Sequence, residues 1–204
     1  MNPYVTGEAA FYGRIFHVTP DVLIPRFETE VLVQELLRRT QKGRVLEIGT
    51  GSGNIAITLA CECPEMEIVT VDCSGPALAV ARLNWERLGG GSRVQFVESD
   101  ALFDAVQGEF DVFVSNPPYL CNVPEEVDSN VCLYEPHIAL FPPDPLYFYR
   151  LFAKQASARL IALEVPHERA YKIQGLFSAW QTELINDLTG RPRVLMGGVS
   201  YGLH

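Results

Sequence analysis

Two stretches of the sequence carry residues whose types and spacing suit the binding of a nucleotide-like molecule. Glycines stand at 49, 51 and 53, directly after the apolar run that contains Glu47. Glycine lets the backbone turn sharply and brings its N–H groups close to a ligand. Asp72 ends the next apolar run, about 20 residues further on, where a carboxylate can accept hydrogen bonds from ribose hydroxyls. The spacing predicts a buried strand, a tight ligand-binding turn and the start of a helix.

A third stretch, Asn116-Pro117-Pro118-Tyr119, follows another apolar run. Its prolines fix φ and lack N–H donors, so the neighbouring carbonyls stay available as rigid acceptors. A planar N–H₂ group can donate to the Asn116 side-chain oxygen and to the Pro117 carbonyl, while Tyr119 stacks on its face. Because a planar amide nitrogen is a poor nucleophile, catalysis there depends on orientation and on matched acceptors. A rigid turn with an aromatic lid is the alternative interpretation.

Two further polar residues lie where ligands often bind. Asp100 follows the apolar run 94–97, and it could accept the amino group of an adenine or cap the turn that follows. Arg26 stands in a proline-fixed turn just before a helix, in the kind of loop that often carries function.

The elements that must position these residues alternate between strand and helix. After a hairpin within residues 4–24, we expect helices near 28–39, 55–60, 76–88, 146–156 and 167–180, and strands near 45–48, 68–72, 94–97, 110–115, 160–164, 182–187 and 193–199. This alternation predicts an α/β fold with a doubly wound, mostly parallel sheet and an antiparallel final strand pair. Residues 117–145 hold seven of the 14 prolines, which favours an ordered substrate flap.

Composition narrows the class of protein. The 204 residues fit one domain, and 48% hydrophobic with 20% charged residues is ordinary for a globular chain. The absence of a long apolar run predicts a soluble, cytoplasmic protein without membrane contact. A formal net charge of −9 disfavours nucleic acid as a partner. Five cysteines without a regular spacing are expected to be reduced thiols.

Taken together, the sequence resembles the HemK/PrmC family of protein-(glutamine-N5) methyltransferases, which modify peptide chain release factors. The segment Ile24-Pro25-Arg26 is its most family-specific part. The resemblance is carried by Phe11, Gly13, residues 22–26, 28–30, 45–53, Asp72, Phe110, Asp111, residues 115–119, Glu135, Pro136, Ala139, Leu140, Asp187, Gly190, Arg191, Arg193 and Val194. The resemblance implies a class I, Rossmann-like fold with a seven-stranded sheet. It divides the chain into a hairpin and linker, residues 1–24, and a methyltransferase domain, residues 25–204.

The resemblance also implies S-adenosyl-L-methionine as methyl donor and the glutamine of a Gly-Gly-Gln motif in release factors as acceptor. The residues it assigns to the donor are Glu47, Gly49, Thr50, Gly51, Ser52, Gly53, Asp72, Asp100, Ala101 and Asn116. It assigns Arg26, Asn116, Pro117, Pro118 and Tyr119 to the substrate, with Asn116, Pro117 and Tyr119 catalytic and no metal. We further expect the protein to be a monomer.

The sequence departs from the family pattern in several places. The N-terminal helical domain of the family, which helps to grip the release factor, is not among these residues. Phe27 stands where a second proline is usual, Pro166 replaces a glycine, and residues 141–145 replace a glycine-rich turn. These departures concern substrate recognition more than donor binding.

Three other functions compete with this hypothesis. Amino-methyltransferases that act on adenine or guanine in nucleic acid share the logic of Asn-Pro-Pro-Tyr, but the acidic balance disfavours them. A dehydrogenase would need the wider G-x-G-x-x-G spacing. A catalytically silent domain that binds the donor or a partner is the third alternative.

Overall fold

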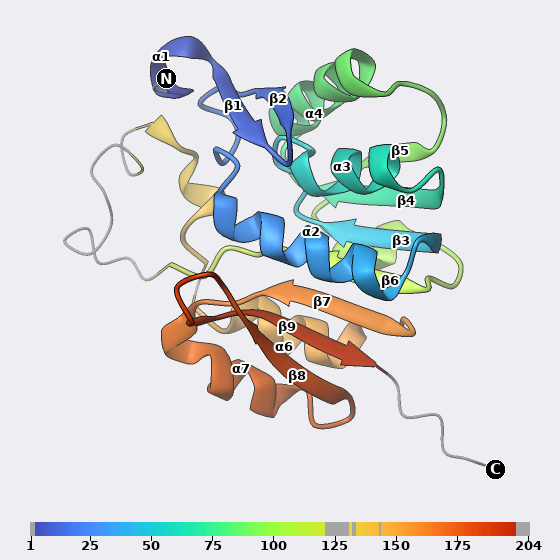
Figure 1. Ribbon diagram of the computed structural model, residues 1–204, viewed down its shortest axis with the longest axis vertical. Coiled ribbons are helices and arrows are strands. Elements are labelled where there is room, and N and C mark those ends of the chain that lie inside the picture. The colour runs from blue at the N-terminus through green and yellow to red at the C-terminus, as the bar shows by residue number, and fades with distance from the viewer. Residues whose placement is uncertain (1–2, 121–130, 132–133, 143, 199–204) are drawn as a thin grey trace.

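A seven-stranded sheet forms the centre of the fold (Figure 1). The computed structural model describes residues 3–120, 131, 134–142 and 144–198. The strands of the sheet are β3 (Lys42–Ile48), β4 (Glu65–Asp72), β5 (Val94–Glu98), β6 (Val112–Ser115), β7 (Leu160–Glu164), β8 (Gln181–Asn186) and β9 (Pro192–Gly198). Their order is β5-β4-β3-β6-β7-β9-β8, and only the pairs that involve β9 are antiparallel. The predicted doubly wound sheet with an antiparallel final strand pair is confirmed.

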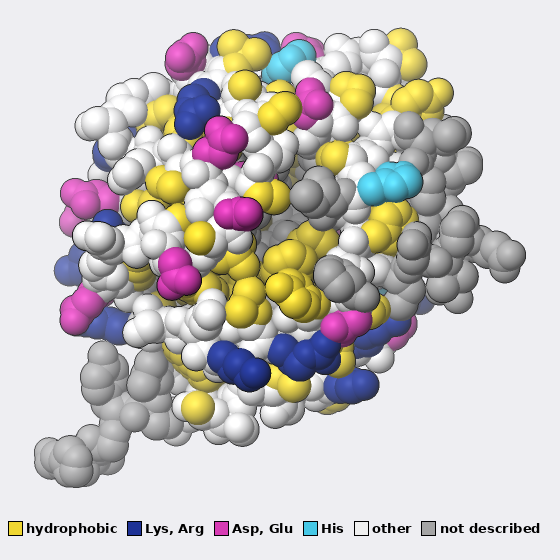
Figure 2. All heavy atoms as spheres, turned by 180° about the vertical axis from the view of Figure 1, so that it is seen from behind, with side chains coloured by type: hydrophobic (Ala, Val, Ile, Leu, Met, Phe, Trp, Pro, Cys, Tyr) yellow, Lys and Arg dark blue, Asp and Glu magenta, His cyan; other side chains and the backbone are white. Residues whose placement is uncertain are grey.

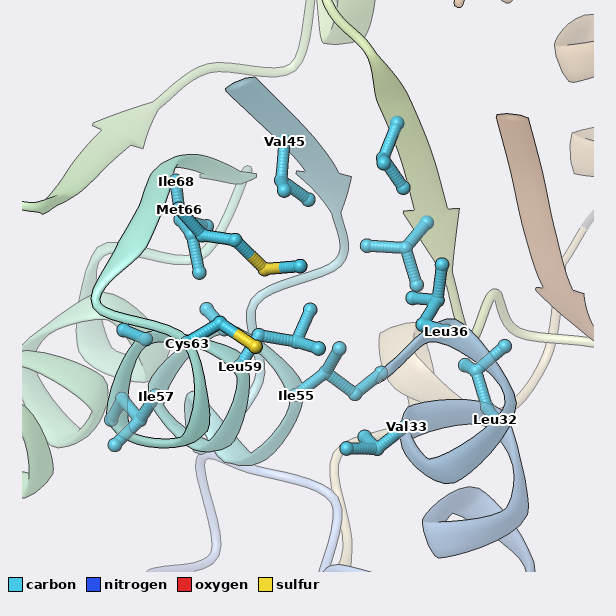
Figure 3. Packing of buried hydrophobic residues seen from close by; sticks show 14 of the residues in the cluster. Leu32, Val33, Leu36, Val45, Ile55, Ile57, Leu59, Cys63, Met66 and Ile68 are labelled. Carbon is cyan, nitrogen blue, oxygen red and sulfur yellow. The ribbon is translucent and has the colours of Figure 1, made fainter. Parts of the chain in front are cut away.

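Helices cover both faces of this sheet. The helices α2 (Phe27–Arg39), α3 (Asn54–Glu62) and α4 (Gly75–Leu88) pack on one face, and α6 (Tyr147–Gln155) and α7 (Ala170–Leu176) pack on the other. Alternation along β3 sends Val45 into the first core and Leu46 into the second. Figure 3 shows side chains of α2, α3, β3 and β4 pointing toward one another in the first core. Both faces of the central strands are therefore apolar, which explains their nearly unbroken apolar runs.

Capping residues and charged residues mark the ends of α4 and α2. The hydroxyl of Ser74 accepts a hydrogen bond from the Ala77 N–H at 3.2 Å and so caps α4, while Pro76 occupies its first turn. Gly89 ends this helix, with its N–H donating to the Trp85 carbonyl. The helix α2 carries Glu28 and Glu30 in its first turn and two arginines in its last, as its dipole favours.

The predicted hairpin is present and is bonded to the main body. It consists of β1 (Glu8–Phe11) and β2 (Arg14–His17), and a short helix that was not predicted, α1 (Pro3–Thr6), precedes it. The buried Asn84 side chain on α4 accepts from the His17 N–H at 2.7 Å and donates to the carbonyls of His17 and Ser52, each at 2.9 Å. One amide thus ties the hairpin, α4 and the glycine turn together.

One helix is shorter than the sequence predicts. The helix expected over 167–180 is a 3₁₀ turn, η4 (His167–Arg169), followed by α7, which ends at Leu176. Beyond it, the Phe177 N–H donates to the Gln174 carbonyl and the Trp180 N–H donates to the Phe177 carbonyl, each three residues back, so the α-helical hydrogen bonding does not continue. Residues 177–180 therefore form a turn between α7 and β8.

The predicted flap is described only in part. A 3₁₀ helix, η3 (His137–Ala139), lies within it, and the Leu120 N–H donates to the Leu140 carbonyl at 3.0 Å. Residues 121–130, 132–133 and 143 lie outside the described residues, as do the expectations for Leu133, Cys121 and Cys132. The three described cysteines, Cys61, Cys63 and Cys73, are free thiols. Within the described part of the chain, no helix has the length and apolar character needed to cross a membrane.

Candidate functional site

The glycine turn and the Asn-Pro-Pro-Tyr segment lie side by side at the centre of the sheet. They follow β3 and β6, two adjacent parallel strands from which the chain continues to opposite ends of the sheet. The Ser115 hydroxyl donates to the Ile48 carbonyl at 2.6 Å and holds the two strand ends together. A Cβ placed on Gly49 would lie 3.8 Å from the Asn116 carbonyl oxygen. This is the switch in strand order at which open α/β sheets bind ligands.

The glycine turn has a backbone that other residues would strain. Gly49, Gly51 and Gly53 have φ values of 90°, 52° and 81°. A Cβ on Gly53 would lie 2.7 Å from the Ile57 side chain, whereas one on Gly51 would meet no atom within 4 Å. Gly53 thus allows close packing of α3, while Gly51 leaves space open above the turn.

Asp72 holds this turn from the next strand. One carboxylate oxygen accepts from the Gly51 N–H at 3.0 Å, and the other accepts from the Ser74 N–H at 2.9 Å. Each oxygen keeps a further lone pair for a ligand. Asp72 is therefore both a support of the turn and an acceptor at the edge of the cavity described next.

A first cavity opens between the glycine turn, β4 and the segment after β6. Its lining combines polar groups with apolar side chains from several elements. Its lining includes Arg26, Thr29, Ile48, Gly49, Thr50, Gly51, Ser52, Asn54, Ile55, Val71, Asp72, Cys73, Leu102, Asn116, Pro117, Pro118, Phe148 and Phe152. Such a mixture of a few fixed polar groups and apolar walls suits a small molecule with a flat apolar part.

A second cavity adjoins the first across Asn116. Its lining is Leu23, Arg26, Asn116, Pro117, Pro118, Tyr119, Leu120, Val131, Ala139, Leu140 and Glu164. Arg26 and residues 116–118 line both cavities, so the Asn-Pro-Pro segment forms the wall between them. Two molecules bound in the two cavities would meet at this segment.

The Asn116 side chain is fixed by a short chain of hydrogen bonds. Its Nδ2 donates to Thr29 Oγ1 at 3.2 Å, and the Thr29 hydroxyl donates to Glu164 Oε2 at 2.6 Å. The Tyr119 hydroxyl donates to the other oxygen of Glu164 at 3.0 Å. Burial raises the pKa of the Glu164 carboxyl, and the two hydroxyl donors oppose that rise.

Not every predicted ligand-binding residue lines a cavity. Glu47 is fully buried beneath the turn, where the Thr70 hydroxyl donates to it at 2.5 Å, and burial raises its pKa to about 8. Its second oxygen is buried without a hydrogen-bond partner among the described residues. Because Thr70 also contacts Thr50 at 2.6 Å, Glu47 supports the turn from below.

The two residues predicted to meet an adenine also lie outside both cavity linings. Asp100 and Ala101 are exposed and line neither cavity, and no side chain caps the 3₁₀ helix η1 (Leu102–Ala105) that follows them. The next residue, Leu102, does line the first cavity and has a φ of 50°, which is rare outside glycine. Gly53 likewise lies outside both linings.

Arg26 is held by a carboxylate that sequence reasoning assigned no role. Glu135 is buried; its Oε1 accepts from Arg26 at 2.5 Å and from the Tyr4 hydroxyl at 2.6 Å. Its Oε2 accepts from the Ile24 N–H at 3.2 Å. The segment around Glu135 is thus fastened to the N-terminal part of the chain beside both cavities.

Thr29, Glu164 and Glu135 are the contacts that sequence reasoning missed. Glu164 carried the same signal as Asp72, an acid at the end of a buried strand. Thr29 stands between two glutamates in a helix, where nothing marks it as buried. Glu135 lies in a segment without periodicity.

Charge on the surface is mixed. On the face shown in Figure 2, hydrophobic side chains gather around a central hollow, acidic side chains lie to one side of it, and basic side chains gather along the lower edge. The formal net charge of the whole sequence is −9. Among the described residues, no cluster of His, Cys, Asp and Glu could hold a metal ion.

Comparison with known proteins identifies relatives of this chain in sequence and in fold. The family model described as the methyltransferase small domain matches residues 27–131. The release factor glutamine methyltransferase of Koribacter versatilis is 39% identical over 207 residues, which cover 95% of this chain and 73% of that protein. The protein of the same name from Chlorobaculum tepidum is 42% identical over 173 residues, covering 77% of this chain and 58% of that protein. A crystal structure of a methyltransferase from Pyrococcus furiosus matches 93% of this chain and 90% of that chain, with a TM-score of 0.67 at 19% identity, which shows a shared fold.

Proposed function

The chain belongs to the release factor glutamine methyltransferase family, and on this premise we propose that it transfers a methyl group from S-adenosyl-L-methionine to a glutamine side-chain nitrogen of a peptide chain release factor. The glutamine is that of the Gly-Gly-Gln motif. The chain spans 73% of one curated relative and 58% of another, so activity of this segment by itself is part of the proposal.

The residues of the first cavity fit the donor. We assign its methionine part to residues 49–52 and its ribose hydroxyls to Asp72, because open space above Gly51 and the remaining lone pairs of the Asp72 carboxylate meet there. The flat adenine would lie against apolar walls that include Leu102 and Phe148. Glu47, Gly53, Asp100 and Ala101 would act by shaping this cavity, since they do not line it. When bound, S-adenosyl-L-methionine supplies an electrophilic methyl group.

The second cavity would take the glutamine. The Asn116 oxygen and the Pro117 carbonyl would accept the two hydrogens of its amide nitrogen, and Tyr119 would bound the flat face of the amide. These acceptors would stabilise the positive charge that develops on the nitrogen as its bond to the methyl carbon forms and the carbon–sulfur bond of the donor breaks to leave a neutral thioether. The nitrogen would then lose one hydrogen as a proton to water. Arg26 lines both cavities and would border the substrate chain.

One observation carries the proposal: Asn116 stands between two adjoining cavities with its amide nitrogen already engaged, so that its oxygen is left for a substrate. A nucleic-acid base would also fit such an acceptor pair, but the net charge of −9 disfavours that substrate. A monomeric state, a cytoplasmic location and the absence of nucleic-acid contact stay predictions.

The test is to incubate the chain with S-adenosyl-L-methionine and an unmodified release factor and to map added methyl groups by peptide mass spectrometry. We expect a single methyl on the glutamine of Gly-Gly-Gln and none on a factor in which that glutamine is replaced by glutamate. Donor binding confirmed by calorimetry, together with an unmodified factor, would overturn the proposal. Transfer to added RNA or DNA instead would favour the nucleic-acid alternative.

A further inference from the structure

The hydrogen bonds around Thr29 have a direction, because each partner has a fixed number of donors. A threonine hydroxyl has one hydrogen to donate, and an ionised carboxylate can only accept. Thr29 Oγ1 lies 2.6 Å from Glu164 Oε2 and 3.2 Å from Asn116 Nδ2. Since the single hydroxyl hydrogen goes to Glu164, Thr29 can only accept from its other neighbour.

The direction of the hydrogen bonds at Thr29 also determines the orientation of the Asn116 side-chain amide. A side-chain amide has a donor end and an acceptor end of nearly the same shape, so the hydrogen-bond partners decide which end faces which way. An acceptor at Thr29 requires the N–H₂ end of Asn116 to point toward it. The oxygen of Asn116 must then point away from Thr29, and Asn116 lines both cavities.

The Glu164 carboxylate, which accepts the Thr29 hydroxyl hydrogen, has charged or titratable groups around it from several elements. Glu164 is buried, and the charged and titratable groups that face it are Glu28 on α2, Tyr119 after β6, Tyr149 on α6 and Arg193 on β9. The Tyr119 hydroxyl donates to its Oε1, and the Tyr149 hydroxyl donates to its backbone carbonyl at 2.8 Å. Burial raises the pKa of the Glu164 carboxyl, and the two hydroxyl donors and the charge of Arg193 oppose that rise.

We propose that Thr29, with its hydroxyl hydrogen committed to Glu164, is a positioning residue that sets which end of the Asn116 amide faces the substrate. This inference rests on the proposed function, in which the Asn116 oxygen accepts a hydrogen of the glutamine amide. With Asn116 turned over, its N–H₂ would face the N–H₂ of the substrate, and the acceptor needed in the transition state would be lost.

Two variants separate the hydroxyl from the shape of Thr29. T29V keeps the branched shape and removes the hydroxyl, whereas T29S keeps the hydroxyl and removes a methyl group. The matched control is T58V, because Thr58 is also fully buried in a helix, yet its hydroxyl has no hydrogen-bond partner among the described residues. The control makes the same chemical change away from the two cavities.

We expect kcat of T29V to fall about tenfold, equivalent to about 1.4 kcal/mol in the barrier. KM for the release factor and the affinity for S-adenosyl-L-methionine should stay within about twofold, because the cavity keeps its shape. T29S and T58V should keep kcat within about twofold of the unchanged chain. A merely structural role would instead lower the melting temperature of T29V and leave kcat of the folded fraction unchanged.

A second measurement does not depend on activity. In protein labelled with ¹⁵N-asparagine, the Asn116 side-chain N–H₂ resonances are identified by their loss in N116D. We expect nuclear Overhauser contacts between these hydrogens and the Thr29 methyl group, and faster solvent exchange of the same hydrogens in T29V.

The two readouts separate the two ideas. Wild-type chain that methylates glutamine, with T29V equal to it in kcat, would overturn the role of Thr29 and leave the proposed function standing. The expected Overhauser contacts in a chain that methylates no release factor would overturn the proposed function and support the orientation of Asn116. Missing contacts between Asn116 and Thr29 would overturn the orientation whatever the activity.

Discussion

Replacing Glu135 with glutamine should loosen the contact that fastens the segment after residue 134 to the N-terminal part of the chain. The side chain of Glu135 is 1% exposed, and its two oxygens accept three hydrogen bonds, from Tyr4, Arg26 and the Ile24 N–H. Glutamine has the same shape but only one side-chain oxygen. Whichever way its amide is placed, an N–H₂ group must face a donor.

Of the two placements of the glutamine amide, the less unfavourable one points its oxygen toward Arg26 and Tyr4. The buried Ile24 N–H then loses its acceptor, which costs about 1–3 kcal/mol. The bond to Arg26, whose side chain is 33% exposed, changes from a charged pair to a charge with a neutral oxygen, at a cost of about 1 kcal/mol. The sum is about 2–4 kcal/mol, which for a chain of this size lowers the melting temperature by about 5–15 °C.

Differential scanning calorimetry of E135Q checks this expectation. The matched control is E8Q, because Glu8 makes a 3.5 Å ion pair with Arg87 in which both side chains are nearly half exposed. Such a pair contributes about 0–1 kcal/mol, so the control should lose less than about 4 °C. A melting temperature of E135Q within about 2 °C of the unchanged chain would refute the reasoning that the three acceptor contacts stabilise the fold.

Three further outcomes follow from the site and from one surface turn. N116A should lower turnover by about 10² to 10³ and leave donor affinity within a few fold, measured by steady-state kinetics and calorimetry; undiminished turnover would remove Asn116 from the mechanism. D72A should weaken donor binding at least about tenfold in calorimetry, because ribose hydroxyls lose their acceptor and the Gly51 N–H loses its own; equal affinity would defeat that assignment. Hydrogen bonds from Thr189, with those from Arg191 and Arg193, lower the pKa of Asp187 to about 2. A lowered pKa in the folded state means that this stability is present above the unfolded value of about 3.9 and is lost as the pH falls from about 4 to about 2. Urea unfolding of D187N should therefore show lower stability at pH 7 and less further loss across that window, and an unchanged profile would exclude the contribution.

The sequence by itself determined the order of the elements and the edge of the sheet at which chemistry takes place. Glycines at 49, 51 and 53, the acid at 72 and the prolines at 117 and 118 act through their own backbone or through neighbours close in sequence. Such local effects can be recognised from the sequence alone. For this reason the strand–turn–helix unit, the caps of α4 and the antiparallel final strand pair agree with expectation.

Only the tertiary structure decided which side chains complete the site. Thr29 and Glu164 are 135 positions apart, and Arg26 and Glu135 are 109 apart, so no local pattern links them. The strand order β3-β6-β7 brings them together, because it places the ends of these strands and the start of α2 at one edge. A buried polar group must find its partner wherever the fold brings one close. The tertiary structure also decided that Glu47 lies buried beneath the turn, that Asp100 is exposed and that Leu102 lines the first cavity.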